Sequence, residues 1–160
     1  MRELTVDDIN DLYQIYQQPK IREFLDDFGD SLEVERDKHK AYIQNIYRFY
    51  GYGLWGVFFK KSGRLIGRCG IEFKMLDQEE VYELGYLLDT TYQGHGYAKE
   101  FVLEVLHYCF FELEIHRIIA VIDKKNLRSI HLAEQVGMQR VGECIRNYRD
   151  CYKYEITYHS

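Results

Sequence analysis

A short glycine-containing turn between a strand pattern and a long helical pattern most limits how this chain can fold. Residues 81–88 form an apolar run typical of a strand, and residues 97–113 carry apolar side chains at helical spacing. A second apolar run, at residues 117–122, has the pattern of a strand that is buried on both faces. A strand, a helix and a strand in this order predict a right-handed parallel crossover. The sequence therefore predicts an α/β domain.

Two helices are predicted before this crossover. The first spans residues 5–18, where Thr5 and Asp8 form a variant capping box, and it ends at Pro19. The second spans residues 31–49. Its apolar face is expected to consist of Val34, Ala41, Tyr42 and Phe49.

The other segments predict antiparallel strands and one more helix. Strand patterns lie at residues 52–59, 65–73, 139–146 and 152–158. The first two flank Lys61-Ser62-Gly63-Arg64, which is a favourable hairpin turn, and a helix at residues 127–136 is expected to stop at Gly137. Together these elements predict a single mixed, mostly antiparallel sheet flanked by helices.

Composition and charge exclude several classes of protein. The chain has 160 residues, 46% of them apolar, which suits a single domain spanning residues 1–160. A formal net charge of −5 argues against nucleic-acid binding. No apolar run approaches the ~20 residues of a membrane span, and the polar start lacks a signal peptide. A cytoplasmic protein with no membrane partner is therefore expected.

The spacing of cysteines and histidines indicates no metal site. The chain has four cysteines, Cys69, Cys109, Cys144 and Cys151. Because they form no Cys-x-x-Cys pair, they are expected to be reduced thiols rather than zinc ligands. The six histidines show neither His-x-x-x-His nor His-x-His spacing.

The glycine-containing turn is the segment that most directly indicates chemistry. In Tyr92-Gln93-Gly94-His95-Gly96-Tyr97-Ala98, two glycines let backbone N–H groups converge, and the following helix adds unpaired N–H groups and the positive end of its dipole. This combination predicts a pyrophosphate site, and the alternative is an ordinary glycine-rich turn. A P-loop is excluded because Gly-Lys-Ser/Thr is absent, and Lys99 stands where the dinucleotide-binding pattern needs a third glycine.

Several motifs in the same order resemble those of the GNAT acetyltransferase family. Residues 93–98 resemble its Gln/Arg-x-x-Gly-x-Gly/Ala signature. Three further motifs and the opening resemble the RimJ/RimL-like branch of ribosomal-protein N-acetyltransferases: Glu83-Leu84-Gly85-Tyr86, Asn126-Leu127-Arg128-Ser129, Gly137-Met138 and residues 2–8. The resemblance covers nearly the whole chain. It implies the GNAT fold, in which a central pair of parallel strands splays apart, with the family's N-terminal first strand largely missing here.

The resemblance also implies a binding site for acetyl-CoA. Backbone contacts to the pantetheine arm would come from Leu87, Leu88 and Asp89. Backbone contacts to the pyrophosphate would come from Gln93, Gly94, His95, Gly96, Tyr97 and Ala98. The side chain of Asn126 would bond the pantetheine arm, cap the following helix, or do both. His95 stands where the family often has Lys or Arg, and the alternative for it is an exposed loop residue.

Candidate catalytic residues follow from the same resemblance. Glu83 stands on the strand where many GNAT enzymes carry a general base; the alternative is a structural carboxylate, and Glu72 is a rival base. Ala133 replaces the tyrosine that often acts as general acid. Ser129 is the candidate acid in its place, and the alternative for it is a serine that bonds the helix backbone. Tyrosines that could substitute for it are Tyr148 and Tyr152.

Three functions are compatible with these features. The leading one is an N-acetyltransferase that moves the acetyl group of acetyl-CoA directly to a primary amine of a protein N-terminus, a polyamine or an aminoglycoside-like molecule. The second is a non-catalytic acyl-CoA-binding sensor or interaction module of a larger protein, and the third is transfer of a different acyl group. An acidic loop at Asp26, Asp27 and Asp30 could attract a cationic acceptor. No metal is expected, and a homodimer is a possibility that the sequence neither supports nor excludes.

Overall fold

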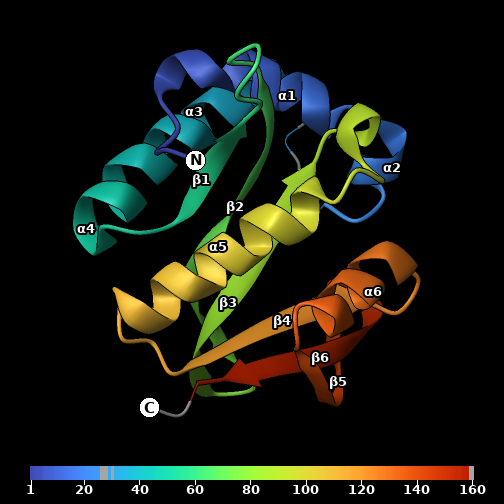
Figure 1. The fold of residues 1–160 in the computed structure, drawn as a ribbon. Helices are drawn as coiled ribbons and strands as arrows, with labels where there is room; N and C mark the ends of the chain where they lie inside the picture. The colour runs from blue at the N-terminus through green and yellow to red at the C-terminus, as the bar shows by residue number, and fades with distance from the viewer. Residues whose placement is uncertain (26–28, 30, 159–160) are drawn as a thin grey trace. The chain divides into compact units, whose positions relative to one another are not determined.

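Six strands form one sheet in the computed structural model, which describes residues 1–25, 29 and 31–158 (Figure 1). They are β1 Leu54–Phe58, β2 Leu65–Leu76, β3 Glu79–Leu88, β4 Arg117–Asp123, β5 Gln139–Arg146 and β6 Arg149–Thr157. Their order is β1-β2-β3-β4-β6-β5. β3 runs parallel to β4, with Glu83 opposite Ile119, whereas the β1–β2, β4–β6 and β5–β6 pairs are antiparallel. The predicted mixed α/β sheet is confirmed.

Helices occupy most of the remaining described segments. They are η1 Val6–Asp8, α1 Ile9–Tyr16, α2 Pro19–Arg22, α3 Leu32–Tyr42, η2 Ile43–Tyr47, α4 Arg48–Tyr50, η3 Thr90–Tyr92, α5 Tyr97–Phe111 and α6 Leu127–Gln135. The chain is divided between two compact units. The first contains Met1–Gly70 and Tyr86–Tyr97, and the second contains Ile71–Gly85 and Ala98–Ser160. β2, β3 and α5 each have residues in both units.

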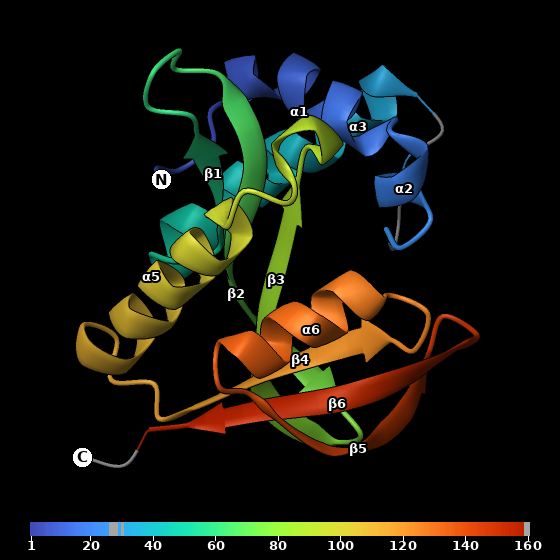
Figure 2. The same cartoon turned by 45° about the vertical axis from the view of Figure 1, so that its right-hand side comes forward.

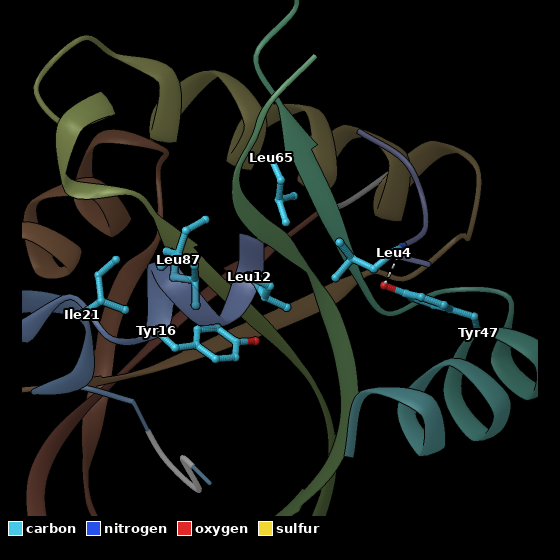
Figure 3. Close-up of a cluster of buried hydrophobic side chains, with 8 residues drawn as sticks. Leu4, Leu12, Tyr16, Ile21, Tyr47, Leu65 and Leu87 are labelled. Carbon is cyan, nitrogen blue, oxygen red and sulfur yellow. Dashed lines mark hydrogen bonds between the residues drawn. The ribbon is translucent and has the colours of Figure 1, made fainter. Parts of the chain in front are cut away.

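A cluster of buried side chains forms the core of the first unit (Figure 3). Its members are Leu4, Leu12, Ile15, Tyr16, Ile21, Tyr47, Leu65 and Leu87. Helical spacing brings Leu12, Ile15 and Tyr16 to one face of α1, and burying each Leu or Ile side chain contributes about 1.5–3 kcal/mol. Leu87 lies near the end of β3, so this core fixes the strand end that leads into the glycine-containing turn.

The second predicted helix has the expected extent but buries a different face. Ser31 caps α3 by accepting a hydrogen bond from the N–H of Val34 at 3.3 Å, and η2 and α4 continue the helical path to Tyr50. Val34, Ala41 and Phe49 were predicted to share its apolar face, but all three are exposed. The π-type turns of η2 also change the phase of the residues that follow α3.

Two polar side chains occupy the buried face of α3 instead. Glu35 accepts a hydrogen bond from the N–H of Gly29 at 2.5 Å, and Nε2 of His39 lies 2.8 Å from the carbonyl oxygen of Thr5. Both side chains are buried. Polar groups with hydrogen-bond partners can replace apolar ones in a buried position, and a pattern of apolar residues does not reveal this.

The first predicted helix ends at Tyr16, three residues before Pro19, and Pro19 begins a separate short helix. It is the first residue of α2, where the fixed φ and missing N–H of proline suit the first helical turn. The acidic loop that was predicted at Asp26, Asp27 and Asp30 lies outside the described residues.

The start of the chain pairs with β1 at one point. Arg2 and Gly56 form an antiparallel bridge with two backbone hydrogen bonds, of 3.2 and 2.8 Å. A Cβ at Gly56 would lie 2.6 Å from a side-chain carbon of Leu4, so glycine allows this close approach. Within the described residues, the N-terminal strand that the resemblance implies is thus represented by an isolated bridge.

In the second unit, α6 packs against β4 and β6 (Figure 2). The hydroxyl of Tyr154 on β6 donates to Glu134 of α6 at 3.1 Å, and Gly137, with φ of +91°, ends the helix as predicted. Alternate residues of β6 face away from α6. On this other side, Lys153 pairs with Asp77 at 2.9 Å.

Candidate active site

Two glycines shape the turn between β3 and α5. Gly94 and Gly96 both have φ of +83°, which L side chains rarely adopt, and no atom beyond the adjacent residues lies within 4 Å of the position that a Cβ would take. The requirement for glycine is therefore conformational rather than steric. The turn is exposed at Gly94, His95 and Gly96, so its backbone is open to a ligand.

Hydrogen bonds from the preceding residues hold this turn in place. Nε2 of Gln93 donates to the carbonyl oxygen of Leu88 at 2.9 Å. The carboxylate of Asp89 accepts from the N–H of Thr91 at 2.9 Å and from its hydroxyl at 2.7 Å. Burial opposes ionisation of Asp89, but these hydrogen bonds outweigh it and hold the pKa of Asp89 below its ordinary value. The N–H of Thr90 donates to the side chain of Gln18 at 2.9 Å.

At the end of β3, the backbone groups of Leu88 point to the opposite edge of the strand from those of Leu87 and Asp89. The N–H of Asp89 donates to the carbonyl oxygen of Ile66 on β2 at 2.7 Å, and the carbonyl oxygen of Leu87 faces Gly67 on the same strand. Successive residues in a strand direct their backbone groups to opposite edges. The N–H of Leu88 is therefore directed away from β2. Among the three residues predicted to bond the pantetheine arm, the amide of Asp89 is already paired with β2.

Aromatic rings pack beneath the turn. The ring of Phe59 lies 5.3 Å from that of Tyr92 and 5.8 Å from that of Tyr97, and the ring of His95 lies 5.8 Å from that of Tyr97. Tyr97 and Ala98 are the first two residues of α5. The first-turn N–H groups of an α-helix have no intrahelical partner, and they carry the positive end of its dipole. The segment from Gln93 to Ala98 thus has the features of an anion cradle.

Asn126 caps α6, which confirms one of its two predicted roles. Its Oδ1 accepts a hydrogen bond from the N–H of Ser129 at 3.2 Å. This bond uses the side-chain oxygen, so Nδ2 is the atom of Asn126 that could donate to a ligand. Ser129 lies in the first turn of α6 and is half-buried.

Glu83 is buried and lies between two cations. Both guanidinium Nη atoms of Arg146 donate to its two carboxylate oxygens, with Nη2 at 3.0 Å from Oε2. Nζ of Lys74 lies 3.6 Å from the same Oε2, and 3.1 Å from the rival candidate Glu72. Paired cations offset the cost of burying a carboxylate. We call Glu83, Arg146 and Lys74 the Glu83 clamp. It corresponds to the structural alternative for Glu83, with one cation on β5 and the other on β2, the direct neighbour of β3.

Residues 1–139 match the family model described as "Acetyltransferase (GNAT) domain". The chain belongs to the GNAT acetyltransferase family. The resemblance found in the sequence motifs is thereby confirmed at the level of the family. The RimJ/RimL-like branch stays a prediction.

Curated relatives of this GNAT chain include several proteins of Bacillus. An "Uncharacterized N-acetyltransferase p20" of Bacillus licheniformis is 27% identical over 150 residues, which cover 92% of this chain and 82% of p20. The protein YkkB of Bacillus subtilis is 37% identical over 89 residues, which cover 56% of this chain but only 52% of YkkB. Among solved structures, a putative ribosomal-protein-serine acetyltransferase of Vibrio cholerae superposes with a TM-score of 0.81 at 24% identity, covering 98% of this chain and 91% of that one. That likeness shows the GNAT fold.

The candidate acids of this GNAT chain occupy different environments. Tyr148 is fully exposed at the turn between β5 and β6. The ring of Tyr152 lies between two cations, 4.6 Å from the guanidinium of Arg140 and 5.1 Å from Nζ of Lys124. Ala133 is buried in α6. The structure therefore gives Tyr152, but not Tyr148, packed neighbours that would fix its position.

A hollow of about 350 Å³ lies in the second unit. It is lined by Glu80, Val81, Tyr82, Leu113, Glu114, Ile115, His116, Arg117 and Ile119. None of these is a predicted site residue.

Within residues 1–25, 29 and 31–158, no group of three or more His, Cys, Asp or Glu side chains is placed to hold a metal. No helix in the described part of this GNAT chain is long and apolar enough to cross a membrane.

Three residues around the candidate site were missed by sequence analysis. Arg146 binds Glu83 across 63 positions of sequence, and Gln18 binds Thr90 across 72. Nη2 of Arg64 lies 3.7 Å from Oδ2 of Asp89. No local spacing pattern in a single sequence links residues so far apart, so only the folded chain reveals these partners.

Proposed function

We propose that this GNAT protein transfers the acetyl group of acetyl-CoA directly to a primary amine. The observation that carries the proposal is the backbone of Gly94 and Gly96, which have the same positive φ in the turn before the first residues of α5. Such a turn lets N–H groups converge on an anion, and the helix dipole adds to the attraction. The family match independently supports acetyl-CoA as the acyl donor.

Groups of this chain suit each part of acetyl-CoA. The N–H groups of residues 93–98 would bond the pyrophosphate. The N–H of Leu88, which points away from β2, would bond the pantetheine arm or hold the negative charge that develops on the thioester oxygen. Nδ2 of Asn126 would be a further donor to the arm while Oδ1 caps α6. When bound, acetyl-CoA supplies an acyl thioester.

The reaction needs proton transfer at two atoms. The acceptor must be a neutral amine, because an alkylammonium with a pKa near ~10 has no lone pair. Glu83 is the candidate base, and its hydrogen bonds to Arg146 support the competing structural role. Ser129 is the candidate donor to the departing thiolate. The family match supports an amine as the acceptor class, and it leaves protein N-termini, polyamines and aminoglycoside-like molecules as equal candidates.

Substitution at Gly96 tests the cofactor assignment. We expect Gly96→Asp to weaken acetyl-CoA binding by at least tenfold, or about 1.4 kcal/mol, because a carboxylate would repel the pyrophosphate. Isothermal titration calorimetry measures the affinity. Gly63→Asp is a matched control, since Gly63 also has positive φ, +71°, and open space, but lies in the turn between β1 and β2. A folded Gly96→Asp protein with the affinity of the Gly63→Asp control would contradict the site.

An activity assay separates the enzyme from a binding module. Thiol release from acetyl-CoA is followed with a panel of amines: peptides with free N-termini, spermidine and an aminoglycoside. Release with at least one amine, and a mass gain of one acetyl group on that amine, is expected. One observation favours the alternative of an acyl-CoA-binding module, namely the bidentate contact of Arg146 with the candidate base Glu83. Tight acetyl-CoA binding without release for any amine would support that alternative.

A further inference from the structure

Two cysteines face each other across the hairpin of β5 and β6. The strand register places Cys144 directly opposite Cys151. Directly opposite residues of an antiparallel pair project from the same face of the sheet, with Cβ atoms about 4.5–5.5 Å apart. Both thiols are free in this structure.

The hairpin geometry brings the two backbones to a spacing that suits a disulfide. Asn147 and Tyr148 form a two-residue turn with φ of +49° and +61°, flanked by the pair Arg146 and Arg149. The pair that flanks such a turn is hydrogen-bonded, and the pattern alternates, so Cys144 and Cys151 also form a hydrogen-bonded pair. Cα atoms of such pairs lie about 5.5 Å apart. Disulfides span Cα separations of about 4.4–6.8 Å and Cβ separations of about 3.5–4.5 Å, so the Cα spacing suits the bond, and the two strands must draw slightly closer for the Cβ atoms to reach it. Strain of this kind makes a disulfide easier to reduce.

The two thiols differ in how a reagent can reach them. Cys144 is half-buried, and its pKa is raised by burial and by the charges of Asp77 and Glu83, against the opposing charges of Arg146 and Lys153. Cys151 is 4% exposed, and its Sγ donates to the carbonyl oxygen of Arg149 at 3.6 Å. A reagent from solution would therefore reach Cys144 first, and Cys151 would react with Cys144 from within the hairpin.

We propose that Cys144 and Cys151 form a reversible cross-strand disulfide when the protein meets a disulfide oxidant such as oxidised glutathione. The thiolate of Cys144 attacks one sulfur of oxidised glutathione, that S–S bond breaks, and one glutathione thiolate leaves. The sulfur of Cys151 then attacks Cys144 and displaces the second glutathione. In total, two protein thiols are oxidised, one oxidised glutathione is reduced to two thiols, and the protons of Cys144 and Cys151 pass to solvent or to the leaving thiolates.

The disulfide would act on the part of the hairpin that carries Arg146. Cys144 and Arg146 are two positions apart on β5, so their side chains project from the same face, where Arg146 holds Glu83. Closing the ring from residue 144 to residue 151 removes freedom from the unfolded chain. The oxidised protein is therefore expected to resist heat better than the reduced one. This inference does not depend on the proposed acetyl transfer.

Intact mass and peptide mapping test the proposal. The purified chain is incubated with excess oxidised glutathione and alkylated. The expected result is a mass loss of two hydrogens with Cys144 and Cys151 joined in one disulfide-linked peptide. Cys69 and Cys109, which are both fully buried, should stay reduced and be alkylated only after unfolding. The melting temperature should rise by a few degrees, about 2–6 °C, and fall back when a reducing agent is added.

Two conservative variants supply the controls. Cys151→Ser should stop at the intermediate and carry one glutathione on Cys144, whereas Cys144→Ser should gain neither a disulfide nor heat resistance. Circular dichroism before oxidation verifies that each variant is folded. Several results would overturn the proposal: wild type that keeps four free thiols, a glutathione adduct on Cys144 that Cys151 never displaces, or a disulfide between two molecules.

Discussion

The buried carboxylate of Glu83 depends on the two cations of the Glu83 clamp. Arg146 binds both of its oxygens, and Lys74 lies on the same side. The sequence motif placed Glu83 correctly on β3 but gave no sign of Arg146. Local spacing identifies residues of one element, whereas the partner of a buried charge is chosen by the fold.

Removing the charge of Glu83 tests the clamp. We expect Glu83→Gln to lower the free energy of unfolding by about 3 kcal/mol, because the guanidinium of Arg146 loses its compensating charge. Urea denaturation measures this loss. If Glu83 is also the general base, kcat should fall and its pH dependence should change while acetyl-CoA affinity is kept.

A double variant separates the clamp from simple loss of packing. Adding Arg146→Met to Glu83→Gln removes the uncompensated cation, so the double variant should be more stable than the sum of the two single losses predicts. Strictly additive losses would count against the clamp. An unchanged rate and pH profile in Glu83→Gln would make the residue structural only.

The buried hydroxyl of Tyr47 leads us to expect that the folded protein loses stability at high pH. This hydroxyl donates to the carbonyl oxygen of Leu54 and accepts from the N–H of Leu4 at 3.4 Å, and burial raises the pKa of Tyr47 to about 12. An unfolded tyrosine has a pKa of about 10, so the folded state binds this proton more tightly. The contribution is therefore complete below about pH 10 and is lost as the pH rises to about 12, a change of about 3 kcal/mol.

The phenylalanine variant isolates this effect from other titrating groups. Unfolding free energies of wild type and Tyr47→Phe are compared by urea denaturation at about pH 9 and about pH 11.5. The difference between the two proteins should shrink at the higher pH. Parallel profiles would show that the ionisation of Tyr47 does not contribute.

At the scale of elements, the bounds of a helix were easier to predict than the face that it buries. The segments 97–113 and 127–136 were assigned as helices and match α5 and α6 except at their last residues. The segment 31–49 is helical almost throughout, yet its predicted apolar face was wrong because Glu35 and His39 are buried with partners. Helix termini are marked by local signals such as Ser31 and Gly137, whereas the buried face depends on distant chain segments.

The cap of α6 allows its structural role to be separated from cofactor binding. Asn126→Asp keeps an oxygen acceptor for the N–H of Ser129 but removes the Nδ2 donor, whereas Asn126→Ala removes both. We expect the alanine variant to lose about 1 kcal/mol of stability and the aspartate variant to keep its stability. Acetyl-CoA affinity should fall in both. If acetyl-CoA affinity falls in the alanine variant alone, as stability does, then Asn126 acts only as the cap of α6.

At the scale of the whole molecule, the order of helices and strands along the chain was predictable. Which strands lie next to each other in the sheet was predictable only in part. The strand–helix–strand pattern from residue 81 to residue 122 predicted the parallel pairing of β3 and β4, which is confirmed. The place of β6 between β4 and β5 follows no local signal. It depends on which strands bury their faces together, and no spacing within one segment reveals this.

Acetyl-CoA should protect the whole chain against heat. A ligand at one hundred times its Kd adds about 2.7 kcal/mol to the free energy of unfolding. For a chain of this size, each kcal/mol raises the melting temperature by about 2–4 °C. Differential scanning fluorimetry across a series of acetyl-CoA concentrations should show a progressive rise that is absent in Gly96→Asp and kept in Gly63→Asp. A flat series in wild type would remove the basis of the proposed function.

The division of the chain has a consequence for its synthesis. The first unit needs Tyr86–Tyr97 as well as Met1–Gly70, and fifteen residues of the second unit, Ile71–Gly85, are made in between. An emerging chain therefore cannot complete its first unit until residue 97 has left the ribosome. Folding in order of synthesis, the usual course for successive domains, would here leave Ile71–Gly85 of the second unit as an insertion within the first. No single proteolytic cut or stop codon would release either unit complete and free of residues of the other.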